Sequence, residues 1–295
     1  MILIDGKQTA ADIRAELTEK VSAIKEKGGK VPHLSIMLIG DDPASDIYVR
    51  NKIKACEAAG FGATLIRYGA DVSEKEVLDK IQAVNQNDDI DGLIIQSPFP
   101  DHISPEKVTF AIDPRKDVDG FHPVNIGRMA KGLPAYVAAT PFGIVELLRR
   151  YEIETSGKHC VVIGRSDIVG TPMALLMSRK AYPGNCTVTI CHSRTKDLPS
   201  ITRQADILIA ALGKPEIVTA DMVKKGVVII DVGTSRVEDP TKKSGYALKG
   251  DVKFDEVAEK ASYITPVPGG VGPMTIASLM YNTWLASQGE IYPSI

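Results

Sequence analysis

Tyr48 and Lys52 stand four residues apart in the stretch SDIYVRNKIKACEAAG, which covers residues 45–60. If the stretch is a helix, both side chains lie on one face. A lysine held in a cleft, away from water, favours its charged form less strongly and can then accept and return protons as a general base. Most lysines on helices are solvated instead, and a tyrosine at this spacing is more often a half-buried packing residue. The spacing alone leaves both interpretations open.

Two glycines mark a turn at which a phosphate group could bind. The stretch GRSDIVGTP, residues 164–172, follows an apolar run over 158–163 and precedes a helical pattern. At such a turn a doubly wound sheet holds a pyrophosphate against the N-terminus of a helix. Gly164 would permit the tight turn and Gly170 a close approach of the backbone, although the spacing is not the usual GxGxxG. A purely structural turn is the alternative, but the flanking strand and helix favour a dinucleotide site.

The end of the next strand bears on the choice between NAD and NADP. It has the sequence CHSRT, residues 191–195, without the carboxylate that usually accepts from the ribose 2′-hydroxyl of NAD. Arg165, Ser166 and Arg194 can instead donate to a 2′-phosphate, because guanidinium donors match phosphate oxygens. We therefore predict NADP as the cofactor. The alternative is that Arg194 is an ordinary solvated loop residue.

Short apolar runs alternate with helical patterns along most of the chain. Strands are expected over residues 33–40, 62–69, 92–97, 158–166, 186–193, 205–213, 226–233 and 261–265. Helices are expected over residues 7–28, 43–60, 73–86, 141–151, 168–180 and 273–288. Several runs are apolar at consecutive positions, which suits parallel strands covered on both faces. The alternation indicates βαβ units and an α/β fold.

One long segment breaks this alternation. Residues 98–140 are rich in proline, glycine and aspartate and contain no convincing strand pattern. We interpret the segment as a long connection between two α/β lobes. The helix that follows is expected to begin with Thr140 as its N-cap and Pro141 as its first residue.

Composition argues against several classes of protein. The 295 residues suffice for one large or two ordinary domains with a substantial core. The net charge is −2, without a basic stripe or acidic block, so neither nucleic acid nor an anionic membrane is expected as a partner. No signal-peptide pattern or transmembrane-length apolar run is present, and we expect a cytoplasmic protein. The four cysteines and five histidines lack metal-ligand spacing, which favours free thiols and no metal site.

Several motifs occur together in one order along the chain: SDIYVRNK, KDVDGFHPVNIG, GRSDIVGTP, CHSRT, LKGDV and TPVPGGVGPMT. Over nearly the whole chain they resemble the bifunctional methylenetetrahydrofolate dehydrogenase/methenyltetrahydrofolate cyclohydrolase family. The last motif is long and unusual enough to be specific by itself. The resemblance implies a one-carbon folate enzyme that oxidises 5,10-methylenetetrahydrofolate with NADP and then hydrolyses the methenyl product to 10-formyltetrahydrofolate.

The resemblance also implies an architecture of two α/β lobes around a cleft. Residues 1–139 would form an N-terminal catalytic and folate-binding domain with a parallel sheet, and residues 140–272 a Rossmann domain for NADP. Residues 273–295 would form a C-terminal helix that returns to the N-terminal lobe. A homodimer is implied as well, with tetrahydrofolate one-carbon derivatives as its small-molecule partners.

The resemblance gives roles to residues of the N-terminal half, with Lys52, Gln96 and Tyr48 as the predicted catalytic set. Lys52 matches the family's catalytic lysine, and Tyr48 matches the tyrosine that stacks on the aminobenzoyl ring. Gln96 ends its predicted strand, where α/β sheets bind ligands, and its amide could hydrogen-bond Lys52 and help set the protonation state of the lysine. Asp119 would accept the adjacent N–H donors of the pterin, whereas Asp117 would support the loop. Taken alone, KDVDG would be interpreted as a turn.

The stretch TPVPGGVGP, residues 265–273, combines stiff prolines with glycines that allow close backbone approach. The family uses it to line the nicotinamide and folate positions, and Pro273 is expected to open the last helix. The predicted substrate-binding residues are Tyr48, Asp119, Pro268, Gly269 and Gly270. The predicted cofactor-binding residues are Gly164, Arg165, Ser166, Ile168, Gly170, Ser193, Arg194 and Thr234.

The chain departs from the family pattern at three places. Ser97 and Phe99 replace the leucines of a Gln-Leu-Pro-Leu-Pro run, which changes the pocket wall and keeps Gln96. Ala139 stands where the family often has cysteine. Thr234 and Ser235 replace the usual Ile-Asn pair, which could alter cofactor contacts slightly.

Two other functions remain as alternatives. An NADP-dependent dehydrogenase of another small molecule, of the shikimate type, would also combine an α/β lobe, a Rossmann lobe and a catalytic lysine. It would not explain the TPVPGGVGPMT stretch, nor the presence of Gln96 and Asp119 beside Tyr48 and Lys52. A nucleotide-sensing regulatory protein without catalysis is the other alternative, but it would have no evident use for Lys52.

Overall fold

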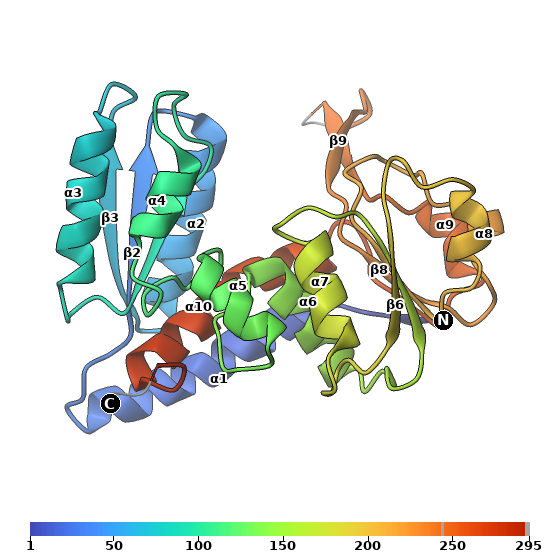
Figure 1. The fold of residues 1–295 in the computed structure, drawn as a ribbon, viewed down its shortest axis with the longest axis horizontal. Helices are drawn as coiled ribbons and strands as arrows, with labels where there is room; N and C mark the ends of the chain where they lie inside the picture. Colours follow the sequence, from blue (N-terminus) through green and yellow to red (C-terminus); the bar gives the residue numbers. More distant parts are fainter. Residues whose placement is uncertain (243–244, 293–295) are drawn as a thin grey trace. The chain divides into compact units, whose positions relative to one another are not determined.

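The computed structural model describes residues 1–242 and 245–292, and the chain forms two compact units (Figure 1). The six-stranded unit comprises Met1–Ala10 and Thr140–Thr275, and the three-stranded unit comprises Ala11–Ala139 and Ile276–Ile295. Each unit is an α/β fold around a parallel sheet, as the alternation along the sequence predicts. The domain limits given above stay a prediction about which segments would fold independently.

The sheet of the six-stranded unit has the strand order β1-β11-β8-β7-β5-β6, and all neighbouring strands are parallel. The strands are β1 (Ile2–Leu3), β5 (His159–Ile163), β6 (Thr187–Cys191), β7 (Ile207–Ala210), β8 (Val228–Asp231) and β11 (Tyr263–Ile264). β7 and β8 are buried at every position, the pattern of strands covered on both faces. On one face of the sheet, Leu208, Ala210 and Ile229 of these strands form an apolar core with residues that include Val161, Ile163 and Ile264.

Short elements complete this unit, and most of them have no clear sequence signal. The helices are α6 (Ala139–Arg150), α7 (Gly170–Ser178), α8 (Leu198–Thr202) and α9 (Phe254–Ala258), with a single 3₁₀ turn η1 (Ala220–Met222). An antiparallel hairpin of β9 (Ser235–Glu238) and β10 (Tyr246–Lys249) stands apart from the main sheet (Figure 1). The sequence predicted α6 and α7 but missed β1, the hairpin, α8 and α9, because two to five residues are too few to show a periodic pattern.

The three-stranded unit has the strand order β3-β2-β4, again parallel throughout. Its strands are β2 (His33–Ile39), β3 (Gly62–Tyr68) and β4 (Gly92–Gln96). Its helices are α2 (Pro43–Ala58), α3 (Glu74–Asn85), α4 (Pro105–Ala111) and α5 (Pro123–Ala130), with most of α1 (Gly6–Glu26) and α10 (Val271–Gln288). Met37, Leu93 and Ile81 are fully buried in its core, against which Phe99 packs. Phe99 therefore replaces a family leucine without leaving the apolar wall.

The interpretation of residues 98–140 as a plain connection was wrong, because the segment contains the helices α4 and α5. Each helix begins with a proline directly after a capping residue. The side chain of Ser104 accepts from Lys107 N–H, and that of His122 accepts from Val124 N–H. Proline at the first helical position is a start signal as well as a breaker. The segment holds no strand, in agreement with the sequence.

The starts of two long helices also differ from the prediction. α6 begins at Ala139 rather than after Thr140, and α10 begins at Val271, so that Pro273 is its third residue. The first N–H groups of a helix have no partner within it, so a proline is tolerated anywhere in the first turn. The proline therefore locates the start only to within a few residues.

The last helix packs on the three-stranded unit, which confirms the predicted return of the C-terminus. From Ile276 onward the chain belongs to that unit. The ammonium of Lys20 on α1 lies 4.0 Å from the centre of the Trp284 ring on α10. Within the described ranges, no helix has the combination of length and apolar character needed to cross a membrane. All four cysteines are buried free thiols.

Candidate functional site

Lys52 and Gln96 meet in the three-stranded unit. α2 starts at the N-cap Asp42, whose carboxylate accepts from Ser45 N–H, and it carries Tyr48 and Lys52 on consecutive turns. β4 ends at Gln96. Lys52 Nζ donates to Gln96 Oε1 over 3.0 Å, so the hydrogen bond predicted from the sequence is present.

The orientation of the Gln96 amide is fixed by a second bond. Gln96 Nε2 donates to the carbonyl oxygen of Ser97 over 2.8 Å, which leaves the amide oxygen to face Lys52. An acceptor held in place stabilises either an ammonium or a neutral amine, because both can donate an N–H. Tyr48 is 59% exposed, so it is accessible to a ligand.

Asp117 organises the loop that follows β4, as the sequence suggested. Its carboxylate accepts from the backbone N–H of His122 over 2.8 Å and from Asn125 Nδ2 over 2.9 Å, with a longer bond from Phe121 N–H. Burial raises the pKa of Asp117 to about 7, while the bonds from Asn125 and His122 oppose that rise and the charge of Asp119 adds to it. The carboxylate of Asp117 therefore already accepts hydrogen bonds from residues that follow it in the chain.

Asp119 is different, because its carboxylate receives no hydrogen bond from the part of the chain that the structure describes. The residue is half-buried. Burial raises its pKa, and the positive charge of Lys52 opposes the rise. Lys52, Gln96 and Asp119 thus come together, with one carboxylate left to accept donors from a ligand.

Gly120 allows the chain to turn directly after Asp119. Its φ angle is +73°, and a Cβ atom there would lie 2.7 Å from the backbone nitrogen of Ala138. A side chain would therefore strain the backbone and displace the neighbouring segment. The Asp-Gly pair is a turn, as its composition indicates, and the turn presents the carboxylate.

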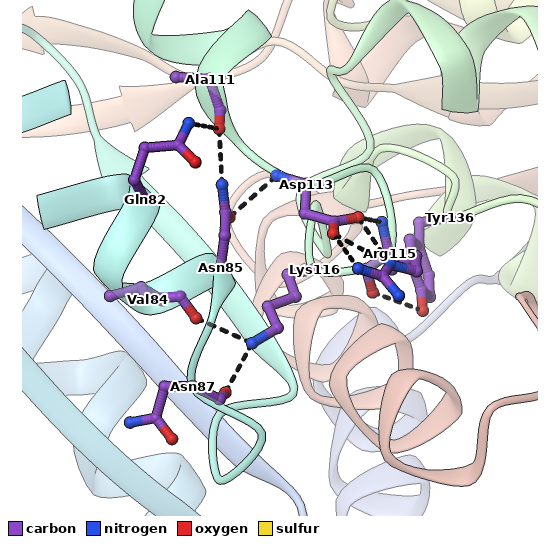
Figure 2. A network of polar contacts seen from close by, with 9 residues as sticks. All are labelled: Gln82, Val84, Asn85, Asn87, Ala111, Asp113, Arg115, Lys116 and Tyr136. Atoms are coloured by element: carbon purple, nitrogen blue, oxygen red, sulfur yellow. Dashed lines mark hydrogen bonds and ion pairs between the residues drawn. The ribbon is translucent and has the colours of Figure 1, made fainter. Parts of the chain in front are cut away.

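A polar network attaches the segment before Asp117 to the end of α3 (Figure 2). The buried Lys116 ammonium donates to the carbonyl oxygens of Val84 over 2.8 Å and Asn87 over 2.6 Å. Asn85 donates to Ala111 and accepts from the backbone N–H of Asp113. Burial lowers the pKa of Lys116, although neighbouring carboxylates oppose that shift. A cation that caps the C-terminus of a helix stabilises it, so this lysine is structural.

The predicted cofactor turn has the geometry that its glycines require. Gly164 has a φ angle of +131°, and a Cβ atom there would lie 2.4 Å from Ala211 O. A Cβ atom on Gly170, at the start of α7, would lie 2.3 Å from Gly164 O. Strand and helix therefore approach each other more closely than any side chain permits. The tight turn and the close approach expected from the sequence are both present.

Two strand ends of the six-stranded sheet present the predicted phosphate ligands side by side. Ile163 pairs with Cys191 in the ladder of β5 and β6, so the residues that follow each strand emerge at the same edge. Arg165 and Arg194 are exposed, and within the described ranges no side-chain hydrogen bond or ion pair occupies either guanidinium. Ser166, Ile168, Ser193 and Thr234 are exposed at this edge or beside it.

Sequence reasoning missed two buried aspartates near the same edge. Asp231, the last residue of β8, accepts from the N–H groups of Gly233, Asp251 and Val252, each over 2.9 Å. Asp251 accepts from the N–H groups of residues 212–214, which follow β7. Burial raises the pKa of Asp231 to about 6, although the hydrogen bonds that its own carboxylate accepts oppose the rise. The two carboxylates hold the loops after neighbouring strands.

Each of these two aspartates also packs closely against a glycine: Asp231 against Gly250, and Asp251 against Gly233. A Cβ atom on Gly250 would lie 1.9 Å from Asp231 Oδ2, and one on Gly233 would lie 2.3 Å from Asp251 Oδ1. The sequence signal was present as Asp-Val-Gly and Lys-Gly-Asp-Val, an acid within two residues of a glycine in each motif. Neither motif reveals that the other supplies its partner.

The proline-glycine loop lies in the six-stranded unit, against the start of α1. Gly269 O accepts from Lys7 N–H over 2.9 Å, and a Cβ atom on Gly6 would lie 1.8 Å from Gly270 O. Gly269 has a φ angle of +110°. Pro268 is exposed and Gly269 is half-buried, whereas Gly270 is buried, so Pro268 and Gly269 are the two predicted residues of this loop that are open to a ligand. Within the described ranges, no group of three His, Cys, Asp or Glu residues is arranged to hold a metal ion.

Two family models match the chain. The tetrahydrofolate dehydrogenase/cyclohydrolase catalytic domain matches residues 4–119, and the tetrahydrofolate dehydrogenase/cyclohydrolase NAD(P)-binding domain matches residues 138–290. Among curated proteins, the bifunctional protein FolD of Bacteroides thetaiotaomicron is 61% identical, over 99% of this chain and 100% of the relative. That of Phocaeicola vulgatus is 62% identical over the same shares.

Solved structures agree with these matches. The bifunctional enzyme FolD, a methylenetetrahydrofolate dehydrogenase/cyclohydrolase from Campylobacter jejuni, is 44% identical with a TM-score of 0.92, over 98% of this chain and 99% of that one. The FolD enzyme of Trypanosoma brucei, complexed with NADP cofactor and inhibitor, is 37% identical with a TM-score of 0.91, over 99% of each chain.

Proposed function

The chain belongs to the tetrahydrofolate dehydrogenase/cyclohydrolase family, and we propose that it oxidises 5,10-methylenetetrahydrofolate with NADP and hydrolyses the methenyl product to 10-formyltetrahydrofolate. The observation that carries the proposal is the group of Lys52, Gln96 and Asp119, in which a lysine is held by an amide oxygen beside a carboxylate that accepts no hydrogen bond from the residues that the structure describes. Both family models describe tetrahydrofolate enzymes, which removes the support for a shikimate-type dehydrogenase.

In this proposal Lys52 moves protons during hydrolysis. The methenyl carbon carries positive charge, and a cation close to the lysine favours the neutral amine. The neutral amine takes a proton from the attacking water, and the resulting ammonium returns it to a folate nitrogen as the ring opens. Gln96 accepts an N–H from Lys52 in both states and so keeps Nζ in place.

The other proposed residues bind and orient the substrate. Asp119 accepts the adjacent N–H donors on the pyrimidine edge of the pterin, which favours the ionised carboxylate and offsets the cost of its burial. The exposed ring of Tyr48 stacks on the aminobenzoyl group. Pro268, Gly269 and Gly270 stay a proposed part of the ligand surface, of which Pro268 and Gly269 are accessible.

NADP fits the edge of the six-stranded sheet. When bound, it accepts the hydride that leaves the methylene carbon. The turn at Gly164 and Gly170 admits a pyrophosphate to the start of α7, and the guanidinium groups of Arg165 and Arg194 are open to a 2′-phosphate. Ser166, Ile168, Ser193 and Thr234 complete the proposed cofactor set. A homodimer remains a prediction from the resemblance and a cytoplasmic location a prediction from the sequence pattern, and light scattering of the purified protein would check the first.

The overall function is tested by incubating the purified protein with 5,10-methylenetetrahydrofolate and either NADP or NAD. Absorbance follows the reduced cofactor and the methenyl species separately. Reduction of NADP with little accumulation of methenyl product is the expected result, since hydrolysis removes it. Turnover with neither cofactor would contradict the proposed function, and turnover with NAD alone would contradict the phosphate site.

Replacing Arg194 with serine is expected to weaken NADP binding about 10- to 100-fold, because the charge-assisted bonds to the 2′-phosphate are lost. NAD binding should change little. Titration of each oxidised cofactor against the variant measures both. Lys224→Gln is the matched control, since it removes the same charge from the residues that precede β8, where Lys224 pairs with Asp206. Equal effects on NADP and NAD would show that Arg194 does not bind the phosphate.

A further inference from the structure

A buried amide on the last helix contacts both sides of the turn that carries Asp119. Asn282 lies on α10, with 1% of its surface exposed. Its Nδ2 group donates to the carbonyl oxygens of Val118 and Val137, each over 2.9 Å. These two acceptors precede Asn282 by 164 and 145 residues in the sequence. The amide therefore joins three separate segments of the three-stranded unit.

The first acceptor leads directly into the proposed pterin ligand. The carbonyl of Val118 belongs to the peptide group whose nitrogen is that of Asp119. Holding this carbonyl fixes the plane of that peptide, and with it the position of the Asp119 Cα atom from which the side chain departs. Asp119 has no hydrogen bond of its own within the described ranges to fix its carboxylate.

The second acceptor lies on the opposite side of the turn. A Cβ atom on Gly120 would lie 2.8 Å from the carbonyl carbon of Val137, so the segment at Val137 is packed against the residue after Asp119. Asn282 thus holds the peptide before Asp119 and the segment that supports Gly120. Asp117, which binds the far end of the loop, acts independently through His122 and Asn125.

We propose that Asn282 is a positioning residue for folate recognition: through Val118 and Val137 it orients the Asp119 carboxylate toward the pterin. This inference rests on the proposed role of Asp119. With 1% of its surface exposed, Asn282 acts through the backbone of this turn and affects how the Asp119 carboxylate is oriented. Small displacements of a positioned group cost large factors in substrate recognition.

The test compares folded variants in the cyclohydrolase assay. Asn282→Leu keeps the approximate size of the side chain and loses both donors. We expect the KM for methenyltetrahydrofolate to rise about 10-fold, with kcat and the NADP dissociation constant unchanged within about threefold. Thr283→Val is the matched control, because Thr283 is fully buried on the same helix and its hydroxyl donates only within the helix, to Leu279 O. It should keep the wild-type KM.

A third and a fourth variant separate the possible failures. Asp119→Asn, measured in parallel, should raise the same KM, and a wild-type value there would overturn the proposed role of Asp119 itself. If Asp119→Asn raises the KM and Asn282→Leu does not, only the positioning role is wrong. Asn282→Ser retains a single donor and should give an intermediate KM, which serves if the leucine variant does not fold. A parallel loss of kcat and NADP binding would also contradict the proposal, since it indicates general loosening.

Discussion

Methionine in place of Lys52 is expected to slow the hydrolysis of methenyltetrahydrofolate about 10²- to 10⁴-fold, the usual range for loss of a general acid–base group. Methionine fills nearly the same space but cannot donate to Gln96 or move a proton. The Gln96 amide stays anchored to Ser97, so the surrounding structure should change little. Decay of methenyl absorbance measures the rate, and titration with NADP measures cofactor binding, which should remain near the wild-type value.

The control for Lys52→Met is Lys54→Met, an exposed lysine two residues further along α2. Two residues turn the side chain by about 200° around a helix, so Lys54 points away from the face that carries Lys52. It should retain full activity. If Lys52→Met also retained both activities, the lysine would be a solvated surface residue and the proposed mechanism would fail.

Alanine at Gly170 is expected to abolish measurable NADP binding. The added Cβ atom would lie 2.3 Å from Gly164 O and 2.6 Å from Arg165 N, in the middle of the turn that admits the pyrophosphate. Both contacts are with backbone atoms, so relief requires the strand and the helix to separate. Overpacking of this kind costs about 1–3 kcal/mol, and the thermal unfolding midpoint should fall as well.

Gly127→Ala provides the comparison for this variant. Gly127 lies in α5, where a Cβ atom would meet nothing within 4 Å. Alanine there should leave cofactor binding unchanged and stabilise the helix by up to about 1 kcal/mol. Cofactor titration and thermal unfolding of both variants give the answer. Wild-type affinity for NADP in Gly170→Ala would show that the cofactor does not use this turn.

The parts of the fold that the sequence predicted are those with repeated local patterns. β2 and β4 are buried at consecutive positions, and their apolar runs show it. The contact between Lys52 and Gln96 was expected from the family resemblance, because helical spacing alone left the role of Lys52 open; the strand end added only that Gln96 lies at the edge of the sheet where ligands bind. Asp117 and Asp119 were assigned different tasks, and the hydrogen bonds agree for Asp117.

The parts that the sequence did not predict depend on contacts between distant segments. β1 has two residues and exists only because it pairs with β11. Asn282 lies in an apolar helix, where a single amide has no pattern that reveals its acceptors. Asp231 and Gly250 fit each other across an interval that no local rule covers. The prolines that open α4 and α5 were interpreted as breaks, although the same residues start helices.

The interleaving of the two units has a consequence for the newly synthesised chain. Ile2 and Leu3 are synthesised long before their strand partners, Tyr263 and Ile264. Asn282 emerges 164 residues after Val118, which it holds. At about 5–20 residues per second, the Asp119 turn waits roughly 10–30 s for its final support. Each unit needs residues from beyond position 260 before it is complete, so a chain that stops short of its last helix should leave the ribosome without a finished folate site.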